Sequence, residues 1–347
     1  MVLDFISTDC SSINGFSCLW TEPLCRDNGA FIFTHSGVGS NIIPHLNIHN
    51  VARNNMQYET IKEEHSFPLL VMESSEYSSN QCVLRDDETG VWLYQSNCLE
   101  FMDKLIGKYP AGKFDMIFAD PPYFLSNGGI SCHAGKMVKV DKGKWDKSQG
   151  AEINHEFNFE WLSRCQKLLT PNGTIWVSGT HHVIHSIGYA MQQLDMKILN
   201  DISWEKPNPP PNLSCRYFTH STETIIWAAK HKKSKHLFNY KDMRQENGGK
   251  QMKTVWSIKP PNKQEKLFGK HPTQKPVQLL ERVILASTTT ESLVFDPFAG
   301  SSTTGVAAIK HMRKFVGCEI EDDFIKLSIN RIKEAIDNYP HDQRKTT

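Results

Sequence analysis

The sequence contains no C-x-x-C pair, no run of about 18 apolar residues and no glycine-rich loop followed by lysine. Its nine cysteines are scattered singly, which excludes a disulfide framework and is typical of a reducing compartment. The missing apolar run excludes a membrane-spanning helix. Residues 1–16 begin acidic and have no apolar core, so no signal peptide is predicted. These absences together predict a cytoplasmic protein without a membrane partner.

Metal ligation is also unsupported by the sequence. His181, His182 and His185 have helical spacing, but no acidic or thiol side chain is placed beside them as a partner ligand. Zinc sites combine such ligands in sets of about four. We therefore interpret these histidines as structural and predict no metal.

Charge is distributed unevenly, although the formal net charge is only +1. Residues 1–80 carry nine acidic and three basic side chains, whereas residues 230–270 carry twelve basic and three acidic ones. The basic segment also contains Phe238, Tyr240 and Trp256, and this mixture favours a polyanionic partner. A solvated lysine-rich loop is the alternative. The candidate contacts are Lys232, Lys233, Lys235, Arg244 and Lys250.

Strand and helix patterns alternate from about residue 90 onward. Apolar runs predict strands at 91–95, 114–119, 174–179, 198–206, 223–229, 292–296 and 314–320. Helical periodicity predicts helices at 98–106, 156–169 (ended by a TPNG turn at 170–173) and 183–194. Three more helices are predicted near the end of the chain: one begins at 277, one begins at 303, and the last ends at about 336. The predicted fold is α/β, a doubly wound, mostly parallel sheet that binds ligands at the carboxyl ends of its strands.

The same pattern divides the chain into segments. Residues 1–80 show no periodicity and are predicted to be a partly disordered extension. The alternation occupies 90–229 and 271–336, and the basic segment 230–270 interrupts it. Residues 337–347 are predicted to form a tail.

A stiff turn follows the strand at 114–119. Pro121 and Pro122 fix the backbone and remove two donors, which leaves carbonyl oxygens free to accept hydrogen bonds. Asp120 is a further acceptor, and Tyr123 offers a flat ring for stacking. Acceptors beside a stacking face suit a planar substrate with an exocyclic amino group, whose nitrogen is then directed at an electrophile. A proline-stiffened surface turn is the alternative.

A second strand ends at Asp296 and is followed by a loop and a helix. The loop is neither a P-loop nor a G-x-G-x-x-G fingerprint, which disfavours phosphate and dinucleotide binding. Gly300 allows close backbone approach, and the helix N-terminus near Thr303 offers N–H groups to a carboxylate. Glu319, at the end of the next strand, can accept hydrogen bonds from two ribose hydroxyls. This combination suits S-adenosylmethionine, which has a ribose and a carboxylate but no phosphate.

Three motifs in order, DPPY at 120–123, HPTQKP at 271–276 and DPFAGSSTTG at 296–305, resemble those of the β-class amino-methyltransferases of DNA. FADPPYFLSNGGIS, VDKGKWDK, TPNGTIWVSG, NPPPNLSCRYFTHSTETI and GKHPTQKP are similar to segments of the DpnA-type adenine methyltransferases that modify GATC. The resemblance covers residues from about 90 to 336. It implies an S-adenosylmethionine-dependent adenine-N6 DNA methyltransferase.

The resemblance also assigns a role to each segment. It implies that residues 90–229 are the catalytic part, that 230–270 are the target-recognition segment, and that 271–336 are the cofactor-binding part. The implied partners are double-stranded DNA, single-stranded DNA as a second form of substrate, and a companion restriction endonuclease.

In the implied mechanism, adenine is flipped out of the duplex. Tyr123 stacks on the base, while Asp120 and the carbonyl of Pro121 accept its amino hydrogens. Trp145, beside Asp146, is expected to fold over the base or the DNA, with simple loop packing as the alternative. The catalytic candidates are Asp120, Pro121, Pro122 and Tyr123, and the cofactor-binding candidates are Asp296, Phe298, Gly300, Ser302, Thr303, Glu319, Thr273 and Lys275.

Two positions depart from the family pattern. Ser302 stands where glycine is usual, and Asn97 stands where an acidic residue is common. If Ser302 adopts a positive φ, a strain of about 1 kcal/mol would weaken cofactor binding several-fold without abolishing it. Two alternatives therefore stay open. One is cytosine-N4 methylation, which uses the same amino chemistry, and the other is a DNA-binding relative whose catalysis is weak because of Ser302.

Overall fold

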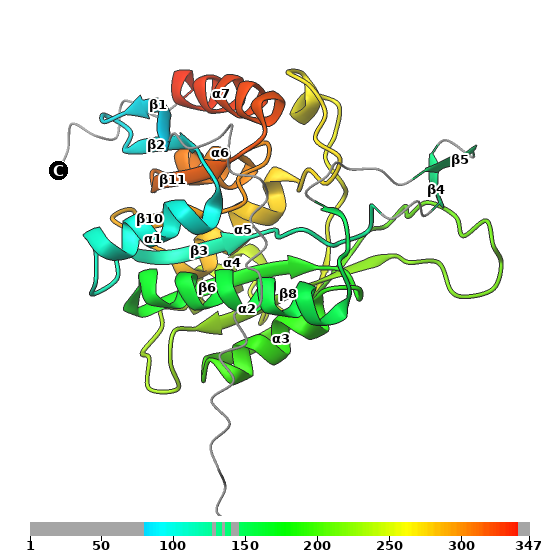
Figure 1. Cartoon of the computed structure of the whole chain (residues 1–347), viewed down its shortest axis with the longest axis horizontal. Coiled ribbons are helices and arrows are strands. Elements are labelled where there is room, and N and C mark those ends of the chain that lie inside the picture. Colours follow the sequence, from blue (N-terminus) through cyan, green and yellow to red (C-terminus); the bar gives the residue numbers. More distant parts are fainter. Residues whose placement is uncertain (1–79, 127–129, 134–135, 140–145, 339–347) are drawn as a thin grey trace, which may run out of the picture. The chain divides into compact units, whose positions relative to one another are not determined.

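A nine-stranded mixed sheet organises this chain (Figure 1). The computed structural model describes residues 80–126, 130–133, 136–139 and 146–338. The sheet strands are β1 (Gln81–Asp86), β2 (Val91–Gln95), β3 (Phe114–Ala119), β6 (Leu169–Gly179), β7 (Lys197–Glu205), β8 (Thr222–Ala229), β9 (Val255–Ser257), β10 (Leu293–Asp296) and β11 (Lys314–Glu319). A separate antiparallel pair consists of β4 (Ile130–His133) and β5 (Lys136–Lys139).

Helices connect most of these strands. They are α1 (Cys98–Lys108), α2 (Ala151–Leu168), α3 (Ile184–Gln193), α4 (Tyr240–Glu246), α5 (Val277–Ser287), α6 (Thr303–Lys310), α7 (Asp322–Asp337) and a short 3₁₀ helix, η3 (Gln264–Lys266). None of the described helices is long and apolar enough to cross a membrane.

The strand order is β1-β2-β11-β10-β3-β6-β8-β7-β9. Strands β2, β11, β10, β3 and β6 run parallel to one another, β1 is antiparallel to β2, and β8 is antiparallel to both β6 and β7. The chain winds outward from β3 in one direction and from β10 in the other, so the sheet is doubly wound. The predicted fold class is confirmed.

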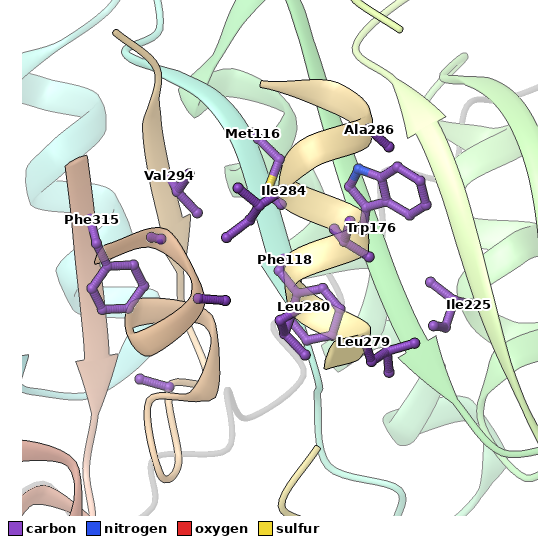
Figure 2. Close-up of a cluster of buried hydrophobic side chains, with 14 of the residues drawn as sticks. Met116, Phe118, Trp176, Ile225, Leu279, Leu280, Ile284, Ala286, Val294 and Phe315 are labelled. Carbon is purple, nitrogen blue, oxygen red and sulfur yellow. The ribbon is translucent and has the colours of Figure 1, made fainter. Parts of the chain in front are cut away.

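Two apolar cores lie on the two faces of the sheet. Alternation along β3 sends Met116 and Phe118 to one face and Ile117 and Ala119 to the other, which explains why residues 116–119 are all apolar. Helices α4 to α7 supply the first core, and Figure 2 shows α5 packed across β3 and β6 there. Helices α1, α2 and α3 supply the second core. The central strand ends are therefore held from both sides.

Some expectations for the backbone were wrong. The TPNG segment at 170–173 lies within β6 and forms the irregularity in its pairing with β3, because Leu169 pairs with Phe114 and Thr174 pairs with Met116. Trp256 of the basic segment is buried and lies near Trp176 in the core. It therefore cannot meet a polyanion. Residues 1–79, Trp145 and the end of the predicted tail, 339–347, lie outside the described residues.

Candidate active site

The carboxyl ends of β3, β10 and β11 bring the two predicted loops together. Phe295 pairs with Ile117 of β3, and Asp296 pairs with Gly317 of β11. The DPPY turn, the DPFAGSSTTG loop and Glu319 therefore leave the same edge of the sheet, which we call the carboxyl edge. Because the winding reverses between β3 and β10, this is the place where open α/β sheets bind ligands.

Asp120 is the centre of a buried polar network. One of its carboxylate oxygens accepts hydrogen bonds from the hydroxyls of Tyr123, at 2.6 Å, and Ser178. The other oxygen pairs with the ammonium of Lys275. Lys275 also lies 3.7 Å from Glu223, whose second oxygen pairs with Lys206. No sequence motif marks Ser178 or Glu223 as site residues.

The network holds Asp120 and Lys275 in their charged forms. Burial by itself would raise the pKa of Asp120, but the charge of Lys275 and the hydrogen bonds that the carboxylate accepts lower the pKa below its ordinary value. Burial would likewise lower the pKa of Lys275, but Asp120 and Glu223 raise it. At neutral pH Asp120 is therefore a hydrogen-bond acceptor and a poor proton acceptor.

Asp146 holds the DPPY turn in shape from beneath. This fully buried carboxylate accepts hydrogen bonds from the backbone N–H of Tyr123, at 2.9 Å, and of Leu125, at 3.2 Å. It also accepts one from the hydroxyl of Ser126. The sequence left two roles open for the loop of Asp146, a cover over the base or simple packing, and its contacts with the backbone of Tyr123 and Leu125 favour packing.

The glycine loop is fastened to Glu319. The backbone N–H of Gly300 donates to one carboxylate oxygen at 2.7 Å, and the N–H groups of Ile320 and Glu321 donate to the other. An ionised carboxylate has about four acceptor sites, so this one retains capacity for a further donor. Glu319 thus shapes the loop and can still bind a hydroxyl.

Asp296 and Arg331 hold the loop from its inner side. Asp296 accepts hydrogen bonds from the N–H of Phe298, at 3.0 Å, and the hydroxyl of Thr304, at 2.6 Å. Arg331, buried in α7, donates to the carbonyl of Ser301 and to the hydroxyl of Thr303 at 2.9 Å. Arg331 carries no motif signature, and sequence reasoning missed it.

The HPTQKP segment joins the glycine loop to the DPPY turn. His271 lies so close to Gly300 that a Cβ there would be 3.1 Å from the His271 Nε2 atom. Gly300 also has a φ of 53°, so glycine is required on two grounds. At the other end of the segment, Lys275 reaches Asp120, and Thr273 accepts a hydrogen bond from Lys275 through its carbonyl. One short segment therefore touches both halves of the site.

Residues 114–330 match the family N6_N4_Mtase, described as DNA methylase. The chain belongs to this family. The Type II methyltransferase M2.LlaDCHI of Lactococcus lactis subsp. cremoris is 55% identical over 233 residues, or 67% of this chain and 87% of that protein. M2.DpnII of Streptococcus pneumoniae is 48% identical over 271 residues, or 78% of this chain and 96% of that protein.

Solved structures agree with the family assignment. The crystal structure of an M1.HpyAVI–SAM complex is 26% identical, has a TM-score of 0.55, and covers 70% of this chain and 98% of its own. The cytosine-N4-specific PvuII DNA methyltransferase is 17% identical with a TM-score of 0.55, over 72% of this chain and 92% of its own, and shows a shared fold. The predicted enzyme class, a DNA methyltransferase that uses S-adenosylmethionine, is confirmed.

The two departures from the family pattern of this DNA methylase have different structural consequences. Asn97 caps α1, accepting hydrogen bonds from the N–H groups of Leu99 and Glu100. Ser302 is fully buried in the left-handed region, with φ 52° and ψ 40°. Its hydroxyl makes no hydrogen bond within the described part of the chain. The positive φ expected for Ser302 is thus observed. Its buried hydroxyl without a hydrogen bond lowers the free energy of unfolding further.

We predict that Ser302→Gly stabilises the DNA methylase. Glycine removes a strain of about 1 kcal/mol and an unsatisfied hydroxyl. Urea unfolding should show that gain, and calorimetry should show several-fold tighter binding of S-adenosylmethionine. The matched control is Ser301→Gly, which loses the hydrogen bond from Arg331 and should be destabilised. Equal or weaker stability of Ser302→Gly would contradict the strain.

A second prediction concerns pH. Burial raises the pKa of Asp296 from 3.8 to about 7. Because the folded pKa is raised, the stabilising contribution of this group is complete below about pH 4 and is lost as pH rises through about 7. Asp296→Asn cannot ionise; its amide oxygen can still accept from the N–H of Phe298, and its NH2 group can donate to the hydroxyl of Thr304 in place of the present bond. Its melting temperature should therefore fall less than that of the wild type between pH 5 and pH 8, which thermal unfolding measures. If the melting temperatures of both proteins changed equally with pH, the raised pKa of Asp296 would be contradicted.

The predicted DNA contacts do not all lie near the active site. Lys232, Lys233 and Lys235 follow the end of β8, which is antiparallel to β6, so they lie at the edge opposite Asp120. Lys232 pairs there with Asp195, and the N–H of Lys235 donates to Asn172. Arg244 lies on α4, and Lys250 lies just after α4.

Other lysines of the basic segment do reach the carboxyl edge. Strand β9 runs parallel to β7 and ends beside Glu205, and the N–H of Ile258 donates to the Glu205 carbonyl. The chain then continues along this edge to HPTQKP. The exposed lysines on that stretch are Lys259, Lys263 and Lys270.

The histidines singled out in the sequence form a ring cluster. The rings of His181 and His182 lie 3.8 Å apart, and His181 stacks on His220 at 4.7 Å. No group of residues suited to hold a metal occurs among the residues described.

Proposed function

We propose that this chain transfers a methyl group from S-adenosylmethionine to the N6 amino group of adenine in DNA, within the sequence GATC. The observation that carries the proposal is the ionised Asp120 carboxylate, fixed by Lys275 at the carboxyl edge beside Tyr123 and the glycine loop. The relatives M2.LlaDCHI and M2.DpnII, both named Type II methyltransferases, support a site-specific DNA activity.

Asp120 acts in this mechanism by accepting a hydrogen bond from the adenine amino group. Hydrogen bonds from that group to Asp120 and to the carbonyl of Pro121 orient the nitrogen lone pair. As the nitrogen becomes positive in the transition state, the fixed negative charge of Asp120 stabilises it, and the lowered pKa of Asp120 keeps this carboxylate ionised. The bond from nitrogen to the methyl carbon would form as the bond from that carbon to sulfur breaks, and the methylated nitrogen would then release one amino proton to solvent. Positioning supplies most of the acceleration, because the base no longer needs to find its orientation.

The residues around the glycine loop fit S-adenosylmethionine. Glu319 retains an acceptor site for a ribose hydroxyl, and Gly300 brings the backbone close without a side chain. Lys275 and the N-terminus of α6 supply positive charge for a carboxylate. When bound, the cofactor supplies an electrophilic methyl group on a sulfonium.

The base site is closed in this structure. Tyr123 is buried, and the Lys275 ammonium lies 5.5 Å from the centre of its ring. A base can stack on Tyr123 only after its neighbours move, and it can reach Asp120 only by displacing one of the present donors.

We also place the DNA on the carboxyl edge, where Lys259, Lys263 and Lys270 are exposed. Their ammonium groups suit backbone phosphates, which supply affinity without reading sequence. Lys232, Lys233 and Lys235 lie on the opposite edge and are not suited to touch the same duplex. A companion restriction endonuclease for the same sequence completes the proposal.

A panel of duplexes tests the sequence assignment. Initial methylation rates are compared for duplexes containing GATC, each single-base variant of it, and a GANTC site. We expect a fast rate on GATC, a large loss for every variant, and the same preference on single strands if these are substrates. A rate on another sequence that equals the rate on GATC would reject the assignment.

A further inference from the structure

The loop between β7 and β8, residues 206–221, begins and ends at the catalytic network. Its neck is closed where the N–H of Lys206 donates to the carbonyl of Ser221 at 2.7 Å. Lys206 pairs with Glu223, and Glu223 lies within 3.7 Å of Lys275. Figure 1 shows this yellow-green loop projecting beyond the sheet. The loop therefore stands over the carboxyl edge, where the proposed function places DNA.

The loop has internal structure and a second attachment to the site. Asn212 accepts hydrogen bonds from the N–H and hydroxyl of Ser214, and its side-chain amide donates to the carbonyl of Tyr217. His220 stacks on His181, three residues beyond the Ser178 that donates to Asp120. Prolines 207, 209, 210 and 211 restrict the entering strand. The tip is thus held in place relative to Asp120.

Residues 216–218 of the loop carry exposed aromatic side chains. Phe218 is 95% exposed and Tyr217 is 61% exposed. Arg216 precedes them, and residues 206–221 contain no acidic side chain. One exposed apolar residue is ordinary, but two adjacent aromatics beside a cation, on a loop that is joined to the catalytic network, match the side chains that enter base stacks.

We propose that this loop enters the duplex, with Phe218 occupying the space in the base stack that the target adenine leaves. This inference rests on the proposed function. Phe218 supplies a flat apolar group that offsets the stacking lost when the base flips out, and Arg216 binds an adjacent phosphate. Because Lys206, Ser221 and His220 attach the loop to the site, they hold residues 216–218 in place relative to the network around Asp120.

The test compares Phe218→Ala with the wild type on two duplexes. One has a paired target adenine, and the other has the same adenine opposite a mismatched base, which is already less well stacked and paired. On the paired duplex, kcat/KM should fall between about fivefold and a hundredfold, the range for lost aromatic stacking. On the mismatched duplex the loss should be much smaller. The fluorescence of a 2-aminopurine at the target position should increase less when the variant binds than when the wild type binds.

Two controls isolate the insertion. Tyr189→Ala removes another aromatic side chain, 57% exposed on α3, and should leave both rates unchanged. Arg216→Ala should weaken binding to both duplexes alike and reduce the salt dependence by about one phosphate contact.

Two results would overturn the inference: an equal loss on both duplexes, or no loss on either. Both results apply only when the wild type methylates adenine in the same assay. If the wild type does not methylate adenine at all, the proposed function fails instead, so the two failures are distinguishable.

Discussion

Asp120→Ala should abolish methyl transfer while largely sparing cofactor binding. The variant removes the acceptor that orients the adenine amino group and the charge that stabilises the transition state. Loss of one such group lowers kcat by about a thousandfold. The contacts of Glu319 and Gly300 do not involve Asp120, so calorimetry should give an affinity for S-adenosylmethionine close to that of the wild type.

The matched control for Asp120→Ala is Asp242→Ala, an exposed carboxylate on α4. It should keep full activity and full cofactor affinity. Single-turnover methylation of a radiolabelled duplex measures the chemical step for both variants. Retention of full activity by Asp120→Ala would show that the DPPY turn is not the catalytic turn.

Lys275→Met should be the most destabilising change in the site. It leaves Asp120 and Glu223 as buried carboxylates without their shared cation. Breaking a buried pair in this way costs about 3–5 kcal/mol of unfolding free energy. Denaturant unfolding at pH 7.5 measures that loss. The matched control is Lys310→Met, whose half-exposed pair with Glu281 should contribute less than about 1 kcal/mol.

The same substitution should change the pH dependence of methylation. Loss of the Lys275 charge raises the pKa of Asp120, so the variant should need a higher pH than the wild type to ionise this carboxylate. The acidic limb of the kcat profile should therefore move to higher pH. Lys275→Met combined with Glu223→Gln removes the carboxylate repulsion and should recover part of the stability without recovering the rate. An unshifted limb in a folded variant would contradict the role of Lys275.

The sequence predicted seven of the nine strands of the sheet, all but β1 and β9, and both loops, because their signals are local. Apolar runs such as 114–119 are buried on both faces, and proline and glycine mark where they end. The contacts within the site are not local. Lys275 lies 155 residues from Asp120, and their meeting depends on β10 lying next to β3. Glu223 and Arg331 were missed for the same reason, because no short motif contains their partners.

The basic segment illustrates a different limit. Its charge is visible in the sequence, but charge does not indicate the edge of the sheet at which each lysine emerges. Strand β9 and the buried Trp256 divide the segment, so that Lys232 and Lys259 lie near different edges. A segment that looks continuous in sequence therefore has only part of its charge near the active site.

Ser302 shows what a resemblance leaves open. The family pattern identifies the position as unusual, and the structure shows its positive φ and its buried hydroxyl. The expected weakening of cofactor binding is several-fold, and the rest of the site is intact. We therefore expect a working methyltransferase.

The most direct test of this account is the identity of the methylated nucleoside. A GATC-containing duplex is incubated with the protein and S-adenosylmethionine, digested to nucleosides and analysed by mass spectrometry. The account predicts N6-methyl-2′-deoxyadenosine as the product, formed by the wild type and formed about a thousandfold more slowly by Asp120→Ala. N4-methylcytosine as the product, or no methylated nucleoside at saturating cofactor, would contradict it.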